Sequence, residues 1–235
     1  MVVTIPAAKA IAQDSLRLQK VWQTVHSNSC PTVYNFHLHT TASDGRLTPL
    51  EIVDQALEFG LKGLAITDHH SVNGYQKAQA YLNEIQAQNQ AQNSERDLFT
   101  LWTGTEITSN LQGVNVHILA YAFNPQHPAI TPYLQSIAPI GEEANAETVI
   151  NSIHNAGGLA ILAHPFRYRR PAQELIPLIC YMGIDGIEAY YSYAKTSPWK
   201  SSPNQTEEGL ELAFKYNLHT SCGTDTHGTN ILLRL

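Results

Sequence analysis

The sequence is poor in charged residues, and above all in basic ones. Only 14% of its 235 residues are charged, and 14 Lys and Arg against 20 Asp and Glu give a formal net charge of −6 at pH 7. This balance argues against tight, sequence-independent binding to long nucleic acids, because such binding requires a basic surface. It leaves room for a small anionic substrate, since bound divalent cations would reverse the field locally.

Cysteine is also scarce, and long apolar runs are missing. The three cysteines are odd in number and form no Cys-x-x-Cys pair, so they predict neither a disulfide framework nor a zinc knuckle. No apolar run approaches the roughly 20 residues of a membrane span. The first 30 residues lack the apolar core of a signal peptide. We therefore expect a cytoplasmic protein with no membrane partner.

Histidine, in contrast, is abundant, with eleven residues. His37 and His39 lie two positions apart in a predicted strand, so their side chains project from the same face. Asp44 follows in a loop that Ser43 and Gly45 allow to turn sharply. Two imidazoles and a carboxylate at one strand end are typical ligands of zinc, manganese or iron. An isolated His-x-His pair is as often simply exposed to solvent, so the other strands decide between these interpretations.

Strand and helix patterns alternate along the whole chain. We predict strands at 32–39, 61–67, 99–103, 114–122, 159–163, 186–190 and 219–222. We predict helices at 6–26, 48–59, 75–90, 142–155, 172–182 and 204–216. Such alternation indicates parallel β/α units and favours an α/β fold, a distorted TIM-like barrel with an N-terminal helix. An open doubly wound sheet is the alternative, but its Gly-x-Gly-x-x-Gly and P-loop motifs are absent.

Residues able to bind a metal recur at or near the ends of these strands, the face at which β/α barrels carry function. The candidates are His37, His39, Asp44, His69, Glu106, His117, His164, Asp225 and His227. A single histidine of this kind is more often structural, but nine candidates converging on one face favour a site for two to three divalent ions. His70 adjoins His69, and a supporting role for it stays open.

Several motifs within residues 34–228 resemble the PHP (polymerase and histidinol phosphatase) family. They are His37-x-His39, Ser43-Asp44-Gly45, Thr67-Asp68-His69, Gly104-Thr105-Glu106, His117, Ala163-His164-Pro165 and Gly223-Thr224-Asp225-Thr226-His227. The resemblance implies a (β/α)7 barrel at 31–235, after an N-terminal helical extension at 1–30. It implies one ion held by His37, His39, Glu106 and Asp225, and a second held by Asp44, His69 and His227. Glu106 would bridge to a third ion, held also by His117 and His164.

These ligands and the resemblance together predict a metal-dependent phosphoesterase. Two or three ions can generate a metal-bridging hydroxide near neutral pH and neutralise a phosphoryl group, so no protein nucleophile is needed. We expect Glu106, Asp225 and His227 to be catalytic, and Arg167 and Arg170 to bind the substrate phosphate, because a guanidinium fits phosphate geometry.

The predicted substrate is a small phosphomonoester, with nucleotide-like molecules favoured. The chain most resembles the stand-alone phosphoesterases that act on nucleotides or short RNA ends. It departs from that branch in the short segment of 47 positions between His117 and His164, where a helical insertion is common. The alternatives are a histidinol-phosphate-type phosphatase and a non-catalytic metal-binding module.

Overall fold

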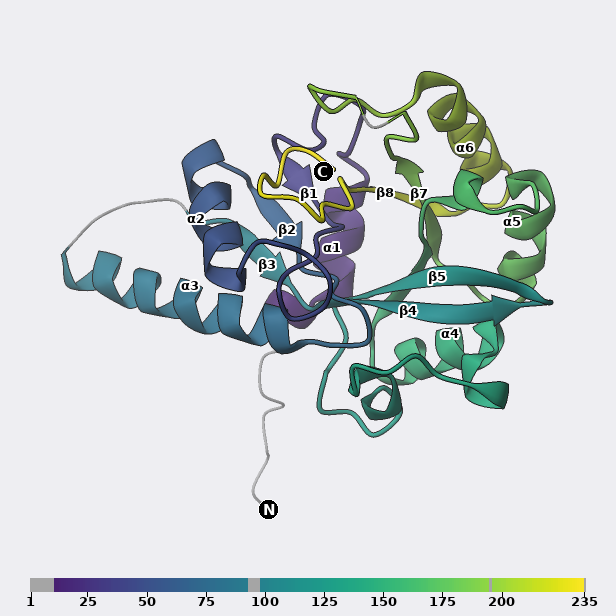
Figure 1. Ribbon diagram of the computed structural model, residues 1–235, viewed down its shortest axis with the longest axis horizontal. Coiled ribbons are helices and arrows are strands. Elements are labelled where there is room, and N and C mark those ends of the chain that lie inside the picture. The colour runs from purple at the N-terminus through teal and green to yellow at the C-terminus, as the bar shows by residue number, and fades with distance from the viewer. Residues whose placement is uncertain (1–10, 93–97, 195, 235) are drawn as a thin grey trace, which may run out of the picture.

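The structure is a computed structural model that describes residues 11–92, 98–194 and 196–234. Its strands lie centrally and its helices pack around them (Figure 1). The strands are β1 (Tyr34–Asn35), β2 (Gly63–Ala65), β3 (Thr100–Trp102), β4 (Gly104–Leu111), β5 (Val114–Tyr121), β6 (Leu159–Leu162), β7 (Gly186–Tyr190) and β8 (His219–Cys222). The α-helices are α1 (Ser15–Trp22), α2 (Pro49–Phe59), α3 (Asn73–Ala91), α4 (Ala146–Asn155), α5 (Ala172–Tyr181) and α6 (Pro203–Lys215).

Most predicted elements are present within a few residues of their predicted ends. The first β/α unit shows why, since its signals are local. Thr48 caps α2 through a capping box with Glu51, and Gly60 ends the helix at a φ of 70°. The predicted N-terminal helix is shorter than expected: α1 begins at Ser15, after a short 3₁₀ helix at Ile11–Gln13. Residues 6–10 of that prediction lie outside the described residues.

The strands form two sheets, which corrects the prediction of parallel β/α units throughout. One sheet has the order β1-β2-β3 and is parallel. The other has the order β4-β5-β6-β7-β8, and its first two pairings are antiparallel. The segment predicted to continue from 99–103 through Glu106 changes sheets at Thr103, and β4 turns back as a hairpin with β5. The fold is therefore mixed α/β, and a closed barrel of regular strands is not confirmed for the part of the chain that is described.

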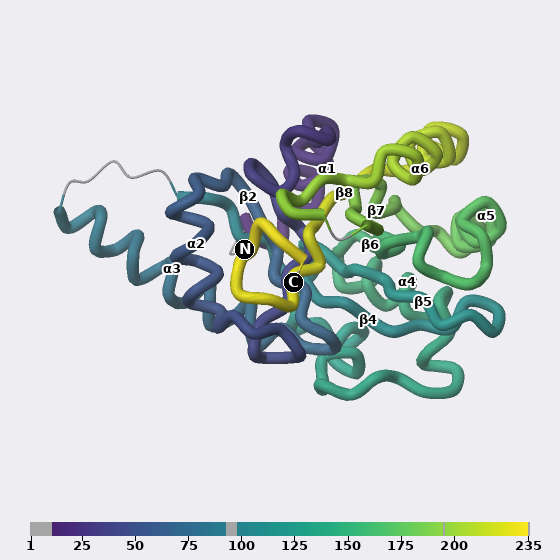
Figure 2. The backbone as a smooth tube through the Cα atoms, turned by 45° about the horizontal axis from the view of Figure 1, so that its top comes forward, coloured from purple at the N-terminus to yellow at the C-terminus, as the bar shows by residue number. Residues whose placement is uncertain are grey.

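The two sheets meet where the metal-ligand candidates lie. Leu38, just beyond β1, forms a parallel bridge with Thr226, and His69, beyond β2, forms one with Glu106 in β4. The backbone N–H of Phe36 donates to the carbonyl of Cys222 at 3.0 Å. The tube in Figure 2 shows the C-terminal segment after β8 running beside the elements that follow β1 and β2. Ligand candidates far apart in sequence are thereby brought to one place.

Helix α1 packs against the other end of the same core. Trp22 is buried, and its ring meets Phe36 and Tyr121 edge-on at centroid distances of 6.3 and 5.5 Å. Each fully buried side chain of this size contributes roughly 1.5–3 kcal/mol through the removal of apolar surface from water.

Among the helices described here, none is both long and apolar enough to cross a membrane.

Candidate metal centre

Glu106 stands at the centre of the site, as the third residue of β4. Its side chain is 1% exposed, and five imidazoles surround the carboxylate. Oε1 lies 2.7 Å from Nδ1 of His117 and 3.3 Å from Nε2 of His164. Oε2 lies 3.1 Å from Nε2 of His37, 3.1 Å from Nε2 of His39 and 3.6 Å from Nδ1 of His69. One buried carboxylate thus connects histidines from four separate segments of the chain.

Asp225 lies beside Glu106 and faces two of the same histidines. Its Oδ1 is 3.4 Å from Nε2 of His37 and 3.3 Å from Nε2 of His39. The backbone at Asp225 adopts a φ of 53°, a conformation that non-glycine residues rarely take. Gly223 allows β8 to come this close, because a Cβ there would lie 2.2 Å from Cβ of His37. The sequence Gly-Thr-Asp therefore places a carboxylate against the His-x-His strand end.

Asp44 forms the exposed side of the cluster. Its Oδ2 lies 3.2 Å from Nε2 of His227 and 3.8 Å from Nε2 of His69, and its side chain is 54% exposed. The loop that carries it is fixed by the buried carboxylate of Asp68, which accepts hydrogen bonds from the Thr40 backbone N–H at 2.7 Å and the Ser43 hydroxyl at 2.7 Å. Asp68 was part of a recognised motif, and here it shapes the loop that presents Asp44.

The candidate ligand atoms fall into three groups, each with members within 4.8 Å of one another. The groups are His37, His39, Glu106 and Asp225; His39, Asp44, His69 and His227; and His69, Glu106 and His117. The first contains the same residues as the first set implied by the resemblance, and the second adds His39. The third contains His69 where the resemblance implied His164, although His164 also approaches Glu106. The structure therefore brings all nine predicted residues together.

The chemistry of the donor set fits divalent cations. His39 is fully buried, yet neither of its ring nitrogens has a hydrogen-bond partner among the described residues, and the same holds for Nδ1 of His164. Leaving buried polar atoms unpaired costs about 1–3 kcal/mol each, so such atoms call for an explanation. Imidazole nitrogens and carboxylate oxygens that converge in this way are ligands for zinc, manganese or iron.

The protonation states of the buried groups are strongly coupled. Burial lowers the pKa of His39, but the neighbouring carboxylates of Asp225 and Glu106 outweigh it and raise that pKa to about 9. Burial raises the pKa of Glu106, but His37 and His117 hold it well below its usual range. In the absence of cations, protons on His37 and His39 thus offset the charge of the carboxylates, because the pKa values of these two histidines are raised. Cations that bind there must displace those protons.

Comparison with known proteins identifies the family. Residues 35–196 match the PHP domain, which is well over half of the chain. The chain belongs to the PHP domain family. The resemblance noted from the sequence is therefore confirmed, and with it the classification of this PHP domain as a metal-dependent hydrolase of the phosphoesterase type.

Relatives of this PHP domain carry names from nucleotide and RNA chemistry. A protein of Haemophilus influenzae named 5′-3′ exoribonuclease is 26% identical over 264 aligned positions, which cover 83% of this chain and 89% of that protein. A 3′,5′-nucleoside bisphosphate phosphatase of Chromobacterium violaceum is 30% identical over 103 residues, which cover 44% of this chain and 32% of that protein. The crystal structure of a candidate metal-dependent phosphoesterase from Bifidobacterium adolescentis has a TM-score of 0.65 at 23% identity, covering 83% of this chain and 88% of that chain.

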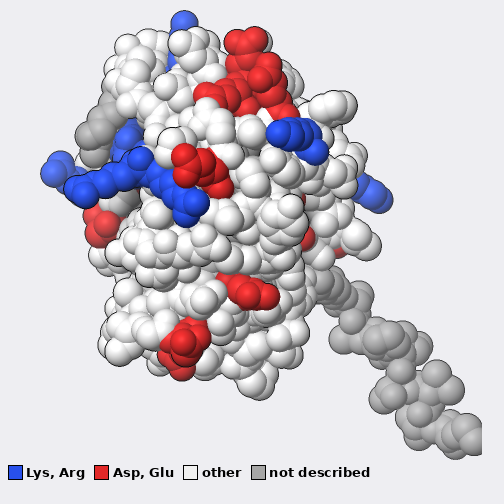
Figure 3. Space-filling model, turned by 90° about the vertical axis from the view of Figure 1, so that its right-hand side faces the viewer, with Lys and Arg blue, Asp and Glu red and all other residues white. Residues whose placement is uncertain are grey.

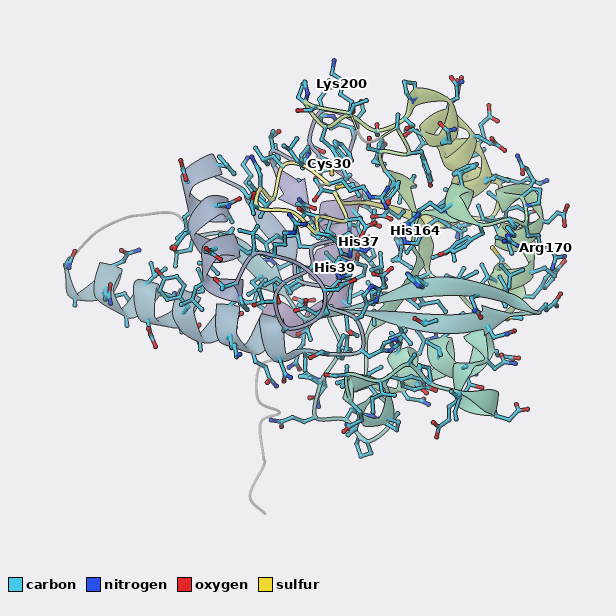
Figure 4. All side chains as sticks on the ribbon, viewed as in Figure 1. Cys30, His37, His39, His164, Arg170 and Lys200 are labelled. Atoms are coloured by element: carbon cyan, nitrogen blue, oxygen red, sulfur yellow. The ribbon has the colours of Figure 1, made fainter. Side chains whose placement is uncertain are left out.

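The two arginines predicted to bind phosphate lie in different surroundings. Nη1 of Arg167 is 3.1 Å from Oδ2 of Asp225, at the edge of the cluster. Nε of Arg170 is 3.0 Å from Oε2 of Glu174, one helical turn along the chain. Figure 4 shows Arg170 beside α5, apart from His37, His39 and His164. The PHP domain therefore brings Arg167 to the ligand cluster and places Arg170 outside it.

Sequence reasoning missed three residues that contact the ligands. Glu188 in β7 lies 3.0 Å from Nδ1 of His37 and also accepts the backbone N–H of His164 at 2.8 Å. The Tyr191 hydroxyl donates to Oδ2 of Asp225 at 2.7 Å, and Nη2 of Arg234 lies 3.2 Å from the same oxygen. A sequence signal existed for Glu188, since it is a charged residue inside an apolar strand. Arg234 lies outside every recognised motif.

His70, whose role the sequence left open, contacts β4 next to the site. Its Nε2 lies 3.2 Å from the Thr108 hydroxyl oxygen, and its backbone φ is 51°. Burial and the neighbouring His69 lower the pKa of His70 to about 4, so its ring is neutral near pH 7. His70 thus fixes the strand connection next to His69 and brings no charge to the cluster.

Proposed function

We propose that this PHP domain hydrolyses a phosphate ester of a small, nucleotide-like substrate, with a phosphomonoester as the leading candidate. The observation that carries the proposal is the position of Glu106, a buried carboxylate that five imidazoles share. Burying a carboxylate among several imidazoles is costly unless their charges are paired, and cations held among them would provide that pairing. It is suited to a multinuclear phosphoesterase, in which Glu106 would help to hold more than one ion, since it belongs to two of the three ligand groups.

The nine ligand candidates would hold two to three divalent ions in the three groups described above. When bound, such ions activate water and neutralise the charge of a phosphoryl group. Glu106, Asp225 and His227 belong to these groups, and we propose them as the catalytic residues. The backbone bridges between the two sheets also support our proposal that residues 31–235 form one distorted barrel around this site, with 1–30 as a helical extension.

Arg167 is proposed to bind the substrate phosphate. Its side chain is 43% exposed, and its guanidinium already faces a carboxylate oxygen of the cluster. A guanidinium can exchange this partner for a phosphoryl oxygen through charge-assisted hydrogen bonds. Arg170 is not proposed as a phosphate ligand, because its contact with Glu174 lies apart from the ligands.

The relatives support a nucleotide-like substrate and raise a second candidate, a short RNA with a 5′ phosphate. The alignment with the exoribonuclease spans 264 positions but uses 83% of this 235-residue chain, so that relative carries additional segments within the aligned span. On the face in Figure 3, acidic side chains lie near basic ones, in keeping with the net charge of −6. We therefore favour a mononucleotide over RNA, because a long backbone needs several basic contacts.

The deciding experiment is a substrate panel run on a preparation of known metal content. A nucleoside monophosphate, a 3′,5′-bisphosphate, a 5′-phosphorylated oligoribonucleotide and histidinol phosphate would each be tested with Zn²⁺, Mn²⁺ and Fe²⁺. We expect release of phosphate from the mononucleotides, and its loss in Glu106→Gln. Preferred release of nucleotides from the RNA would favour the second candidate, and preferred hydrolysis of histidinol phosphate the alternative phosphatase. A metal-loaded protein inactive on the whole panel would favour a non-catalytic module.

A further inference from the structure

The carboxylate of Asp225 has two oxygens in contrasting surroundings. Oδ1 faces the imidazoles of His37 and His39. Oδ2 faces away from them and meets three donors: the Tyr191 hydroxyl at 2.7 Å, Nη1 of Arg167 at 3.1 Å and Nη2 of Arg234 at 3.2 Å. The two sides are linked, because a carboxylate held at one oxygen cannot rotate freely at the other. Whatever fixes Oδ2 therefore fixes the direction of Oδ1 toward the ligand cluster.

The two arginines at Oδ2 differ in their freedom to move. The side chain of Arg167 is 43% exposed, and the residue is the last of a short 3₁₀ helix at Pro165–Arg167. The side chain of Arg234 is 12% exposed, and its guanidinium carbon lies 5.2 Å above the ring centroid of Tyr191. A cation stacked on an aromatic ring and paired with a buried carboxylate is held from two directions.

The backbone around Arg234 is fixed as well. The carbonyl of Arg234 accepts the N–H of His227 at 2.9 Å, which closes a loop that begins at a ligand candidate. Within that loop, the carbonyl of Ile231 accepts the amide of Asn35 at 2.8 Å, and the N–H of Ile231 donates to Gln55 at 2.9 Å. The loop is thus tied to the segment of β1 and to α2, so Arg234 is part of the rigid frame of the site.

We propose that Arg234 is a positioning residue that locks Asp225, whereas Arg167 is the arginine that leaves Asp225 to bind a substrate phosphate. This inference rests on the proposed function for the role of Arg167. When Arg167 turns to the phosphate, Asp225 keeps two donors on Oδ2, Tyr191 and Arg234. The Tyr191 hydroxyl already donates to that oxygen at 2.7 Å, and its ring lies under the guanidinium of Arg234. Tyr191 and Arg234 thus keep Oδ1 of Asp225 directed toward the ligand cluster while Arg167 binds the phosphate.

The first test measures metal affinity and needs no substrate. The full chain, stripped with a chelator, would be titrated with Co²⁺ and followed by its visible absorption. Removing a residue that orients a metal ligand typically weakens metal affinity about 10–100-fold. We expect a loss of that order for Arg234→Met and a smaller loss for Arg234→Lys, which keeps the charge but not the planar fork. Unchanged or tighter binding by a folded Arg234→Met protein would overturn the proposal.

Lys215→Met is the matched control, because its ammonium also lies 5.2 Å from the centroid of a ring, that of Tyr216, at the end of α6. It removes the same kind of contact far from Asp225, and we expect wild-type metal affinity. A comparable loss of affinity in this control would show that the titration reports general stability, and would remove the support for Arg234. Circular dichroism and the melting temperature of each variant establish that it is folded.

The second test separates the two arginines by kinetics on the best substrate of the panel. We expect Arg167→Met to raise KM, and Arg234→Met to lower kcat about tenfold or more with KM little changed. A rise in KM alone for Arg234→Met would make it a second phosphate ligand and overturn the positioning role. If the wild type cleaves nothing, the proposed function fails, while the Co²⁺ titration still decides the role of Arg234.

Discussion

Glu188→Gln is the sharpest single perturbation of the centre that the structure offers. The two carboxylate oxygens of Glu188 have separate tasks: Oε1 lies 3.0 Å from Nδ1 of His37, and Oε2 accepts the N–H of His164 at 2.8 Å. An amide of the same shape has one acceptor oxygen and one donor nitrogen. In the variant, one contact therefore sets a donor against a donor, and either the His37 ring or the His164 backbone loses its partner.

The size of the effect follows from burial, since the side chains of Glu188 and His37 are both 0% exposed. A buried group left without its hydrogen-bond partner costs about 1–3 kcal/mol. Loss of the partner of a metal-ligating histidine weakens metal affinity about 10–100-fold, or about 1.4–2.7 kcal/mol. We expect a weakening of this size in Co²⁺ or Zn²⁺ titrations of Glu188→Gln, together with a lower melting temperature of the metal-free protein.

Asp185→Asn is the matched control, because Asp185, the residue before β7, also contacts an imidazole and a backbone N–H. One oxygen serves both partners: Oδ2 lies 2.8 Å from Nε2 of His154 and accepts the N–H of Ala160 at 2.7 Å. This substitution removes the charge of a carboxylate–imidazole pair, but no ligand candidate is involved. We expect lower stability and unchanged metal affinity. If Glu188→Gln binds metal as tightly as the wild type, the reasoning that Glu188 orients His37 is refuted.

Metal content, phosphate binding and the pH dependence of stability can each be measured separately. Purified without chelator, the protein should hold two to three equivalents of metal by elemental analysis, and the Glu106→Gln variant should hold at least one equivalent fewer. A content below about half an equivalent in the reconstituted wild type would contradict a multinuclear site. Arg167→Ala should lower kcat/KM roughly 10–100-fold at unchanged metal content, and wild-type kinetics would show that it does not bind phosphate. A hydrogen bond that the His154 ring donates to the Asp185 carboxylate outweighs burial and raises the pKa of His154, so the pair stabilises the fold below about pH 6.5 and the gain is lost as pH rises through the raised pKa. His154→Gln should therefore reduce the free energy of unfolding more at pH 6 than at pH 9, by under about 1 kcal/mol because the pair is partly exposed, and an equal reduction at both pH values would contradict this.

Local signals explain why most of the elements could be predicted. The capping box of Thr48 and Glu51, and the Gly60 that ends α2, act within a few residues and need no tertiary contact. The same holds for His37 and His39, whose shared direction follows from the two-residue repeat of an extended chain. Metal-binding residue types at such positions reveal their chemistry because few other roles require several imidazoles and carboxylates together.

Pairing between strands that are far apart in the sequence was harder to predict. Glu106 was expected at the end of a parallel strand, but it lies inside β4, which pairs with β5 in an antiparallel hairpin. Gln112 and Gly113 form the turn of this hairpin, yet nothing in the local sequence marks the change of sheet at Thr103. The left-handed backbone at His164, with a φ of 30°, was equally hidden, because a residue before proline usually avoids helical conformations. Such a conformation persists only where surrounding contacts impose it.

The residues that support the ligands were the hardest to predict, for an electrostatic reason. Glu188 occupies an entirely buried strand of sequence Gly-Ile-Glu-Ala-Tyr, and a carboxylate in such a place must have close partners, which marks it as functional before the partners are known. Nothing in the sequence marks Arg234 in this way, since an arginine near the surface is ordinary. Its importance comes from Asp225, because a carboxylate whose first oxygen faces imidazoles requires fixed donors at its second oxygen to keep its direction. Only the fold brings Arg234 to that second oxygen.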